Sequence, residues 1–282
     1  MKKILLMAVA AMMAISASAQ ETVKKVRVYK EGAIAYEEKY DAVDSIVFVD
    51  VEVPSVPEGA LAGKFSVSAT EQVQFSKGNL QYQASTGTWR FAENQYDMIG
   101  SDNTYISASY SGWIDLFGWG TGSNPTNTST SNSDYSTFTD WGTNAISNGG
   151  NEANLWRTLT KHEWVYLCDT RTVNGGTGNG KSYTLGQYVN GTRGIVLYPD
   201  GYTGATYASS DWSTFEAAGC VFLPAAGFRD GTDVGNVGLH GDYWSATPLG
   251  TNYAYGLYFF SNGLNPQDYG SRDNGQSVRL VR

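Results

Sequence analysis

The sequence is poor in the residues that build metal and redox centres. It has only two cysteines and two histidines in 282 residues. A zinc site needs three or four nitrogen, sulfur or oxygen ligands at suitable spacing, and Cys168, Cys220, His162 and His240 are scattered along the chain. The H-E-x-x-H and G-x-S-x-G patterns of zinc proteases and serine hydrolases are also missing. We therefore expect no cofactor and no enzyme activity of these classes.

Each cysteine lies in an apolar stretch, "VYLC" before Cys168 and "CVFL" from Cys220. This context predicts two small buried hydrophobic residues. A disulfide between them is the alternative, because an exported protein meets an oxidising environment.

Charge is scarce as well, and its balance is acidic. Charged residues make up 16% of the chain, against about 25% in an average protein. Acidic residues outnumber lysine and arginine by 27 to 19, which leaves a net charge of −8. A negative protein repels phosphate backbones and anionic membrane surfaces, so we expect no nucleic-acid partner.

Long hydrophobic runs are missing after residue 20. The first residues, "MKKILLMAVAAMMAISASAQ", combine two lysines, an apolar stretch and an Ala17-Ser18-Ala19 cleavage pattern. This predicts a signal peptide over 1–19. No later segment reaches the ~18 apolar residues of a membrane span. The expected protein is exported to the periplasm, the cell surface or the medium, without membrane insertion, and with a net charge of −10 once Lys2 and Lys3 are removed.

The chain is rich in glycine (33), tyrosine (19) and tryptophan (8). This composition is typical of a turn-rich α+β protein. Residues 20–52 read as a small β unit, with a hairpin around Glu31-Gly32 and a third strand in "DSIVFVD", 44–50. Residues 53–62 contain two prolines and two glycines and read as a linker. The main domain then covers 63–282.

Short helices and strands are expected in the main domain. Thr160 and Glu163 form a capping box that predicts a helix with Trp164, Leu167 and Cys168 facing the core. Asp140 predicts a second helix through Ile146. Ser209 or Ser210 predicts a third, with Trp212, Phe215 and Ala218 inward and Gly219 after its end. Strands are expected at 88–92, 195–198, 220–223, 243–246, 254–260 and 277–281. The loop 121–138 should pack back through Tyr135 and Phe138.

One segment matches a nucleotide-binding pattern. "GGTGNGKS", 175–182, fits the phosphate-binding loop G-x-x-x-x-G-K-[ST]. That loop must lead into a helix, because the helix N-terminus holds the phosphates. The residues that follow, "YTLGQYVNGT", have no helical period. We interpret the segment as a glycine-rich turn.

The C-terminal region combines aromatic and polar side chains. Alternation in 254–260 puts Tyr255, Leu257 and Phe259 on one face of a strand and Tyr258 and Phe260 on the other. The strand is either buried on both sides or has an exposed aromatic face. In the second case the rings join a polar loop at 262–274, anchored by the closing strand. Rigid rings beside small polar groups are typical of recognition surfaces.

The candidate ligand-binding residues share this region. They are Asp242, Tyr253, Tyr258, Phe260, Asn262, Asn265, Gln267, Asp268, Tyr269, Ser271, Arg272 and Asp273. The rings would supply contact area and the other side chains hydrogen bonds and charge, although Arg272 could instead tie the loop to the sheet. "NPQD", 265–268, offers oxygen ligands for Ca²⁺, and a polar loop without metal is the alternative. No carboxylate pair of a glycosidase stands out.

Several segments together resemble a group of secreted Bacteroidetes proteins that carry the Fibrobacter succinogenes major paralogous domain. They are "VQFSKGNLQYQASTGTWRFAENQYDMIG", "GWIDLFGWGTG", "NLWRTLTKHEWVYL", "AAGCVFLPAAGFRDG" and "DYWSATP…YAYGLYFF…GQSVRLVR". That domain is similar to the C-type lectin fold in its formylglycine-generating-enzyme-like branch. The resemblance implies a C-type-lectin-like domain, with short helices and mixed or antiparallel sheets, behind a small β appendage.

The resemblance also implies two functions. The enzyme branch uses cysteines near its C-terminus, and this chain has none after Cys220, so that activity is not expected. The same fold carries the hypervariable ligand-binding proteins of diversity-generating retroelements, whose variable residues crowd the C-terminal part. We expect an exported protein that binds a protein or glycan ligand, and the resemblance implies diversification in this way. The alternatives are a structural envelope or surface-assembly protein, and a formylglycine-generating-like or carbohydrate-active enzyme. The sequence does not indicate an oligomeric state.

Overall fold

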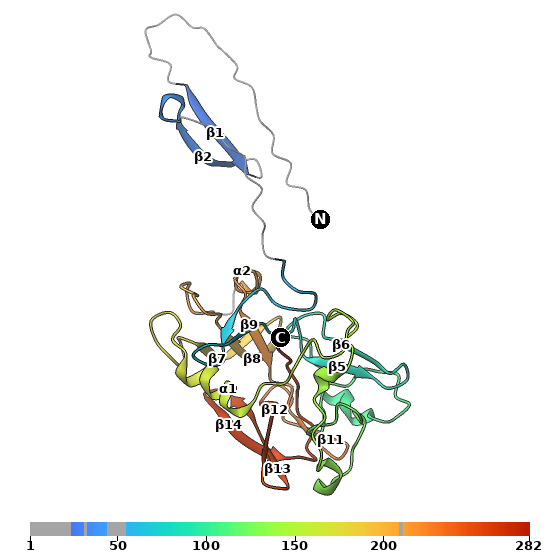
Figure 1. Ribbon diagram of the computed structural model, residues 1–282. Helices are drawn as coiled ribbons and strands as arrows, with labels where there is room; N and C mark the ends of the chain where they lie inside the picture. The colour runs from blue at the N-terminus through green and yellow to red at the C-terminus, as the bar shows by residue number, and fades with distance from the viewer. Residues whose placement is uncertain (1–23, 31–32, 44–54, 209–210) are drawn as a thin grey trace, which may run out of the picture. The chain divides into compact units, whose positions relative to one another are not determined.

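The computed structural model describes residues 24–30, 33–43, 55–208 and 211–282. The chain divides into two compact units, Met1–Pro54 and Ser55–Arg282 (Figure 1). The expected signal peptide (1–19) and the expected third strand (44–50) lie outside the described residues.

The first unit contains the expected hairpin. Strand β1 (Lys25–Lys30) pairs antiparallel with β2 (Ala33–Lys39), and a 3₁₀ turn, η1 (Tyr40–Ala42), follows. The expected linker over 53–62 is too long at its C-terminal end. Ala60 forms a β-bridge with Ser76, and the Leu61 amide donates to the Phe75 carbonyl. The last residues of that segment therefore belong to the second unit.

The second unit is built from short strands and shorter helices. All pairings between its named strands are antiparallel. The pairs are β3 (Phe65–Ser66) with β4 (Gln72–Val73), β5 (Leu80–Gln83) with β6 (Thr88–Phe91), and β10 (Phe228–Asp230) with β11 (Asp233–Gly235). The two larger sheets are β7 (Tyr183–Val189), β8 (Thr192–Leu197), β9 (Val221–Pro224), and β12 (Gly241–Leu249), β13 (Tyr253–Phe260), β14 (Gly263–Ser271).

Two α-helices and four short helical turns complete the described part of this unit, which is of the α+β class. The α-helices are α1 (Lys161–Val165) and α2 (Trp212–Ala217). The turns are η2 (Gly100–Tyr105), η3 (Asn132–Tyr135), η4 (Trp141–Thr143) and the π-turn η5 (Tyr166–Thr170).

The helix predictions have mixed outcomes. The capping box at Thr160 is present, and Trp164, Leu167 and Cys168 are buried as expected. Asp140 does cap Gly142, but only the turn η4 follows, because the Asn144 side chain bonds the Trp141 carbonyl and ends the turn.

For α2, the cap is Asp211, whose carboxylate accepts from the Thr214 amide. The predicted caps, Ser209 and Ser210, lie outside the described residues. Ala218, expected to face inward, is exposed, and Gly219 follows the helix with a positive φ of 83°.

Two other predictions concern loops. The segment 175–182 forms turns that lead into strand β7 and not into a helix, so it lacks the geometry of a phosphate-binding loop. The loop 121–138 packs back on the domain as expected. Tyr135 is buried, and the Phe138 ring packs on Trp119 at 4.8 Å between centroids.

The expected closing strand at 277–281 is not part of a sheet ladder. This segment runs through the centre of the unit and bonds a different partner at almost every residue. Ser277 bridges Tyr243, and Val281 bridges both Phe75 and Arg157. Ser277 and Arg279 are as buried as Val278 and Leu280. The alternating sequence therefore marks a segment buried on all sides, which binds the small sheets together.

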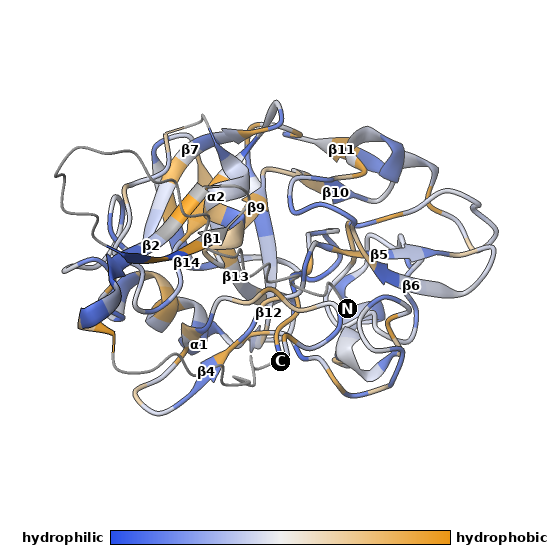
Figure 2. Ribbon diagram, turned by 90° about the horizontal axis from the view of Figure 1, so that it is seen from above, coloured by the Kyte–Doolittle hydropathy of each residue, from blue (hydrophilic) through white to orange (hydrophobic). Residues whose placement is uncertain are grey.

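The core holds an unusual buried arginine. Arg279 donates to the side-chain oxygens of Asn79, at 3.4 Å, and Gln95, at 3.0 Å. Gln95 in turn accepts from the Phe222 amide. Burial lowers the pKa of Arg279 to about 10. Buried hydrophobic residues of β7, β8 and β9, among them Val189, Val196 and Phe222, form a core cluster, and Figure 2 shows orange, hydrophobic ribbon near the β7 and β9 labels.

Candidate functional site

The candidate site lies on one face of the β12–β13–β14 sheet. Residues paired across an antiparallel ladder point to the same face. Asp242 pairs with Tyr258, which pairs with Asn265, and Gly256 pairs with Asp268. The opposite face carries Leu257, Phe259 and Leu264, which pack in the core. The register thus brings Asp242, Tyr258 and Asp268 together.

The segment expected to be a polar loop, 262–274, is mostly strand β14 (Gly263–Ser271). Asn, Gly, Asp and Pro disfavour strands, but here the hairpin with β13 satisfies their backbone groups. Between Gly256 and Tyr258 the register slips by one residue, so Pro266 and Gln267 lie opposite Leu257 in a bulge. Because β14 is at the edge of the sheet, the missing amide of Pro266 is tolerated there.

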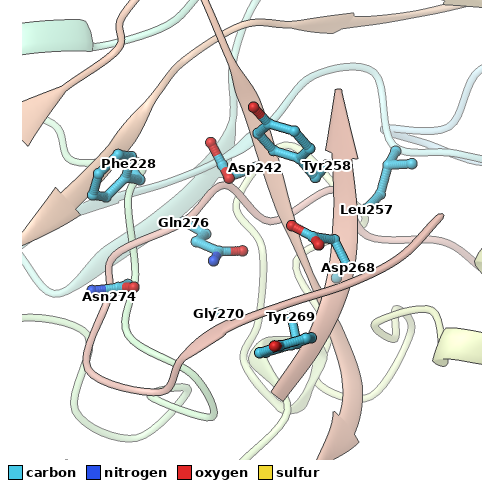
Figure 3. A pocket seen from close by; sticks show the side chains of 10 residues that line it. Phe228, Asp242, Leu257, Tyr258, Asp268, Tyr269, Gly270, Asn274 and Gln276 are labelled. Carbon is cyan, nitrogen blue, oxygen red and sulfur yellow. The ribbon is translucent and has the colours of Figure 1, made fainter. Parts of the chain in front are cut away.

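A pocket of about 150 Å³ opens on this face. Figure 3 shows the carboxylates of Asp242 and Asp268 and the Tyr258 ring around the same space, with Gln276 and Asn274 beside them. The lining residues are Phe228, Asp242, Gly256, Leu257, Tyr258, Asp268, Tyr269, Gly270, Asn274 and Gln276. Gly270 keeps the pocket open to Gln276, because a Cβ there would lie 2.4 Å from the Gln276 amide nitrogen.

The two carboxylates make this pocket electrostatically unusual. Asp242 Oδ2 is buried and has no hydrogen-bond partner among the described residues. Burial, together with the nearby Asp268 carboxylate, raises the pKa of Asp242 to about 7. Burial also raises the pKa of Asp268, although the Tyr269 amide and the Asn265 side chain donate to it. Asp242 is therefore able to hold a proton near neutral pH, and both carboxyl groups can accept a donor.

Aromatic side chains border the pocket on the β13 side. The His240 ring meets Tyr258 edge-on at 5.3 Å, and Phe260 lies 5.8 Å from Tyr258. Tyr258 is half-buried and Phe260 is 38% exposed. The sequence left two alternatives for this strand, burial on both sides or an exposed aromatic face. The structure agrees with the exposed aromatic face.

Two predicted residues, Tyr253 and Tyr269, belong mainly to the other face. Their rings pack edge-on at 5.6 Å, and the register pairs Tyr269 with Tyr255. The Lys161 ammonium lies over the Tyr255 ring at 4.7 Å. Tyr269 also borders the pocket, so it links the two surfaces, whereas Tyr253 does not line the pocket.

Arg272 and Asp273 are buried, contrary to the expected exposed binding role. The Arg272 guanidinium donates to the carbonyl oxygens of Tyr253 and Gly250, and it lies 4.3 Å from the Trp119 ring. This is the structural role that the sequence left as the alternative. Asp273 accepts from the Ser271 hydroxyl.

The remaining predicted residues lie along the hairpin. Asn262, Asn265 and Gln267 are exposed. Ser271 is half-buried and bonds Asn132 in η3. In the described part of the chain, no group of three or more His, Cys, Asp and Glu could hold a metal ion. In the "NPQD" segment, Asn265 donates its amide nitrogen to Asp268.

The sequence did not indicate Phe228, Asn274 and Gln276 as pocket residues. Phe228 comes from β10, and no local pattern links it to β12–β14. Asn274 and Gln276 could have been noticed as the polar residues that end the hairpin before the buried C-terminal segment.

Cys168 and Cys220 are free and buried, which confirms that both are small core residues. Burial raises the pKa of the Cys220 thiol to about 12 and raises the pKa of Cys168 further. Neither thiol lies in the pocket. Among the described residues, no helix is long and apolar enough to cross a membrane.

The comparisons with known proteins add one finding. The family described as "Domain of unknown function (DUF8237)" matches residues 208–281. The comparisons with curated proteins and with solved structures give no match. The matched segment contains every residue that lines the pocket, so the chain is similar to that family over the site itself.

Proposed function

We propose that this chain is an exported recognition protein that binds a protein or glycan ligand on the β12–β13–β14 face of a C-type-lectin-like domain. The observation that carries the proposal is the pocket between Asp242, Asp268 and Tyr258, next to the exposed Phe260 ring. Aromatic rings on rigid strands, beside unpaired polar groups, favour binding at low entropic cost.

The size of the pocket favours binding over catalysis. Pockets that enclose a small-molecule substrate have about 300–1,000 Å³, and this one has about 150 Å³. It holds one side chain or one sugar substituent, while the rest of the ligand would lie on the surrounding surface. We propose further that this surface is diversified by a retroelement, as the sequence resemblance implies.

The test is a binding screen on glycan and protein arrays with a matched pair of variants. Tyr258→Ala removes the pocket ring, and Tyr105→Ala removes a 62% exposed ring on η2, outside the pocket. Tyr258→Ala should weaken the binding of the ligands found by about tenfold or more, as expected when an anchor residue of an interface is truncated. Tyr105→Ala should leave them unchanged, and both variants should keep the melting temperature. Equal losses in both variants, or no ligand at all, would contradict the proposal.

Diversification has its own test, which is sequencing of this locus across many cells of the source community. Substitutions should crowd into the codons for 242–274 and spare those for 277–282. Uniform codons throughout would contradict a retroelement and leave one fixed partner.

A carbohydrate-active enzyme is the second candidate, favoured by the same carboxylate pair. Glycosidases use two carboxyl groups, one of which keeps its proton near neutral pH, as Asp242 does with a pKa of about 7. If the protein hydrolyses a polysaccharide and the Asp268→Asn variant does not, that result would favour this candidate over pure recognition.

A further inference from the structure

The pocket carries negative charge without a positive counterpart. Asp242 and Asp268 contribute carboxylates, and Asn274 and Gln276 contribute side-chain amides, which offer both an acceptor oxygen and a donor nitrogen. None of the described residues that line the pocket carries a positive charge. The acidic groups are not fully paired within the fold, because Asp242 Oδ2 is buried without a donor. A buried carboxylate without a partner is unfavourable, so the pocket is complementary to a donor-rich cation.

Two basic side chains neighbour residues of the pocket. Arg229 on β10 follows the lining residue Phe228, and its two terminal guanidinium nitrogens donate to the carbonyl oxygens of Gly231 and Asn127, while its Nε is buried without a partner among the described residues. His240, before β12, packs edge-on against the pocket ring Tyr258. Neither side chain lines the pocket. A ligand can therefore supply the counter-charge that Asp242 and Asp268 need when both are ionised.

The walls of the pocket select the kind of cation. Tyr258, Tyr269 and Phe228 line it together with the carboxylates. A guanidinium is planar, stacks on aromatic rings and carries five donors in a fixed fork that fits carboxylates. It is also less strongly hydrated than an ammonium. A compact hydrated metal ion would use neither the rings nor the flat shape.

From this geometry we infer that the pocket binds the guanidinium group of an arginine side chain on a protein or peptide ligand. The inference deepens the proposed function, because it names the group that the same face recognises. The rings would contact the guanidinium plane, and the two carboxylates would accept its N–H donors. The volume of about 150 Å³ suits one such side chain, with the remainder of the ligand outside.

Binding of this cation should depend on pH in a defined direction. The free pocket holds a proton at Asp242, whose pKa is about 7. The titratable groups around it are Asp268 and Tyr258, with His240 in edge-on contact with the Tyr258 ring. A guanidinium favours the ionised carboxylate, so binding releases the proton. For a single site of this pKa, linkage predicts that binding is about tenfold weaker at pH 6 than at pH 8.

The experiment uses two probes that have nearly the same shape. Nα-acetyl-arginine amide carries the guanidinium, and Nα-acetyl-citrulline amide replaces it with a neutral urea. Each is titrated into the ¹⁵N-labelled protein at pH 6 and pH 8, and amide shifts are followed. We expect the arginine probe to shift resonances of β13 and β14 at pH 8 and to bind at least tenfold more tightly than the citrulline probe.

Two variants complete the experiment. Asp268→Asn keeps the shape of the side chain and its contact with Asn265 but removes a charge. It should weaken binding of the arginine probe about tenfold. Asp102→Asn makes the same chemical change at an exposed residue of η2 and should have no effect. Dispersed amide spectra show that both variants are folded.

The inference is overturned if citrulline binds as tightly as arginine, if neither probe binds, or if Ca²⁺ alone shifts the same resonances and excludes the arginine probe. It is also overturned if the array screen finds a neutral ligand whose binding is abolished by Tyr258→Ala and unaffected by Asp268→Asn. That last result would leave the proposed recognition function standing, and an array without any ligand would count against that function alone.

Discussion

Replacing Asp242 with asparagine should make this protein more stable at alkaline pH. In the unfolded chain this carboxyl group has its ordinary pKa of 3.8, whereas burial and Asp268 raise it to about 7 in the folded chain. The folded state therefore holds the proton more tightly. The stability that this proton contributes is fully present below pH 3.8 and is lost as the pH rises to about 7.

The size of the effect follows from the two pKa values. They differ by about 3 pH units, and each corresponds to about 1.4 kcal/mol, which gives an upper bound of ~4 kcal/mol. Water that reaches the open pocket screens part of this, so we expect a gain of about 2 kcal/mol for Asp242→Asn at pH 8. At pH 4 both chains are nearly neutral at this position and should differ by less than about 0.5 kcal/mol.

The assay is urea unfolding of the parent and of Asp242→Asn at pH 4, 6 and 8. Asp102→Asn serves as a control for the loss of one exposed carboxylate, and it should follow the parent at every pH. If the free energies of unfolding of Asp242→Asn and the parent change in parallel from pH 4 to pH 8, Asp242 does not carry a raised pKa and the account of the pocket is wrong.

Two further predictions concern buried groups. Arg272→Ala should lower the free energy of unfolding by about 3 kcal/mol, because it leaves the carbonyl oxygens of Gly250 and Tyr253 without their donor; a variant that loses ligand binding at unchanged stability would show that Arg272 acts in recognition instead. Cys168 and Cys220 should not react with a thiol reagent at pH 8 until the protein unfolds, because both are buried and their pKa values are raised. Rapid labelling of either cysteine in the native protein would contradict this prediction.

Local patterns in the sequence predicted local structure well. The capping box at Thr160 and the face of Trp164 depend on residues three or four positions apart, and both are present. The alternation along 254–260 correctly separated Leu257 and Phe259 from Tyr258 and Phe260. In each case the interaction is contained within one helical turn or one strand, so neighbouring residues are enough to decide it.

Predictions that depended on distant partners were wrong. The polar residues of 262–274 do not look like a strand, yet β13 provides a partner for their backbone groups. The alternating residues of 277–281 do look like a half-buried strand, yet their backbone pairs with three distant regions of the chain, 75–80, Arg157 and 242–244. Neither pattern contains information about which segment lies beside it.

The sequence by itself determined that the C-terminal region concentrates aromatic and polar side chains and which of them alternate along one strand, since composition and alternation are properties of the chain. Only the tertiary structure decided which of them meet. The register of β12, β13 and β14 places Asp242 and Asp268 in one pocket, although 25 residues separate them. The raised pKa of Asp242 arises from that meeting, because burial and a second carboxylate act on a group that is ordinary in the extended chain.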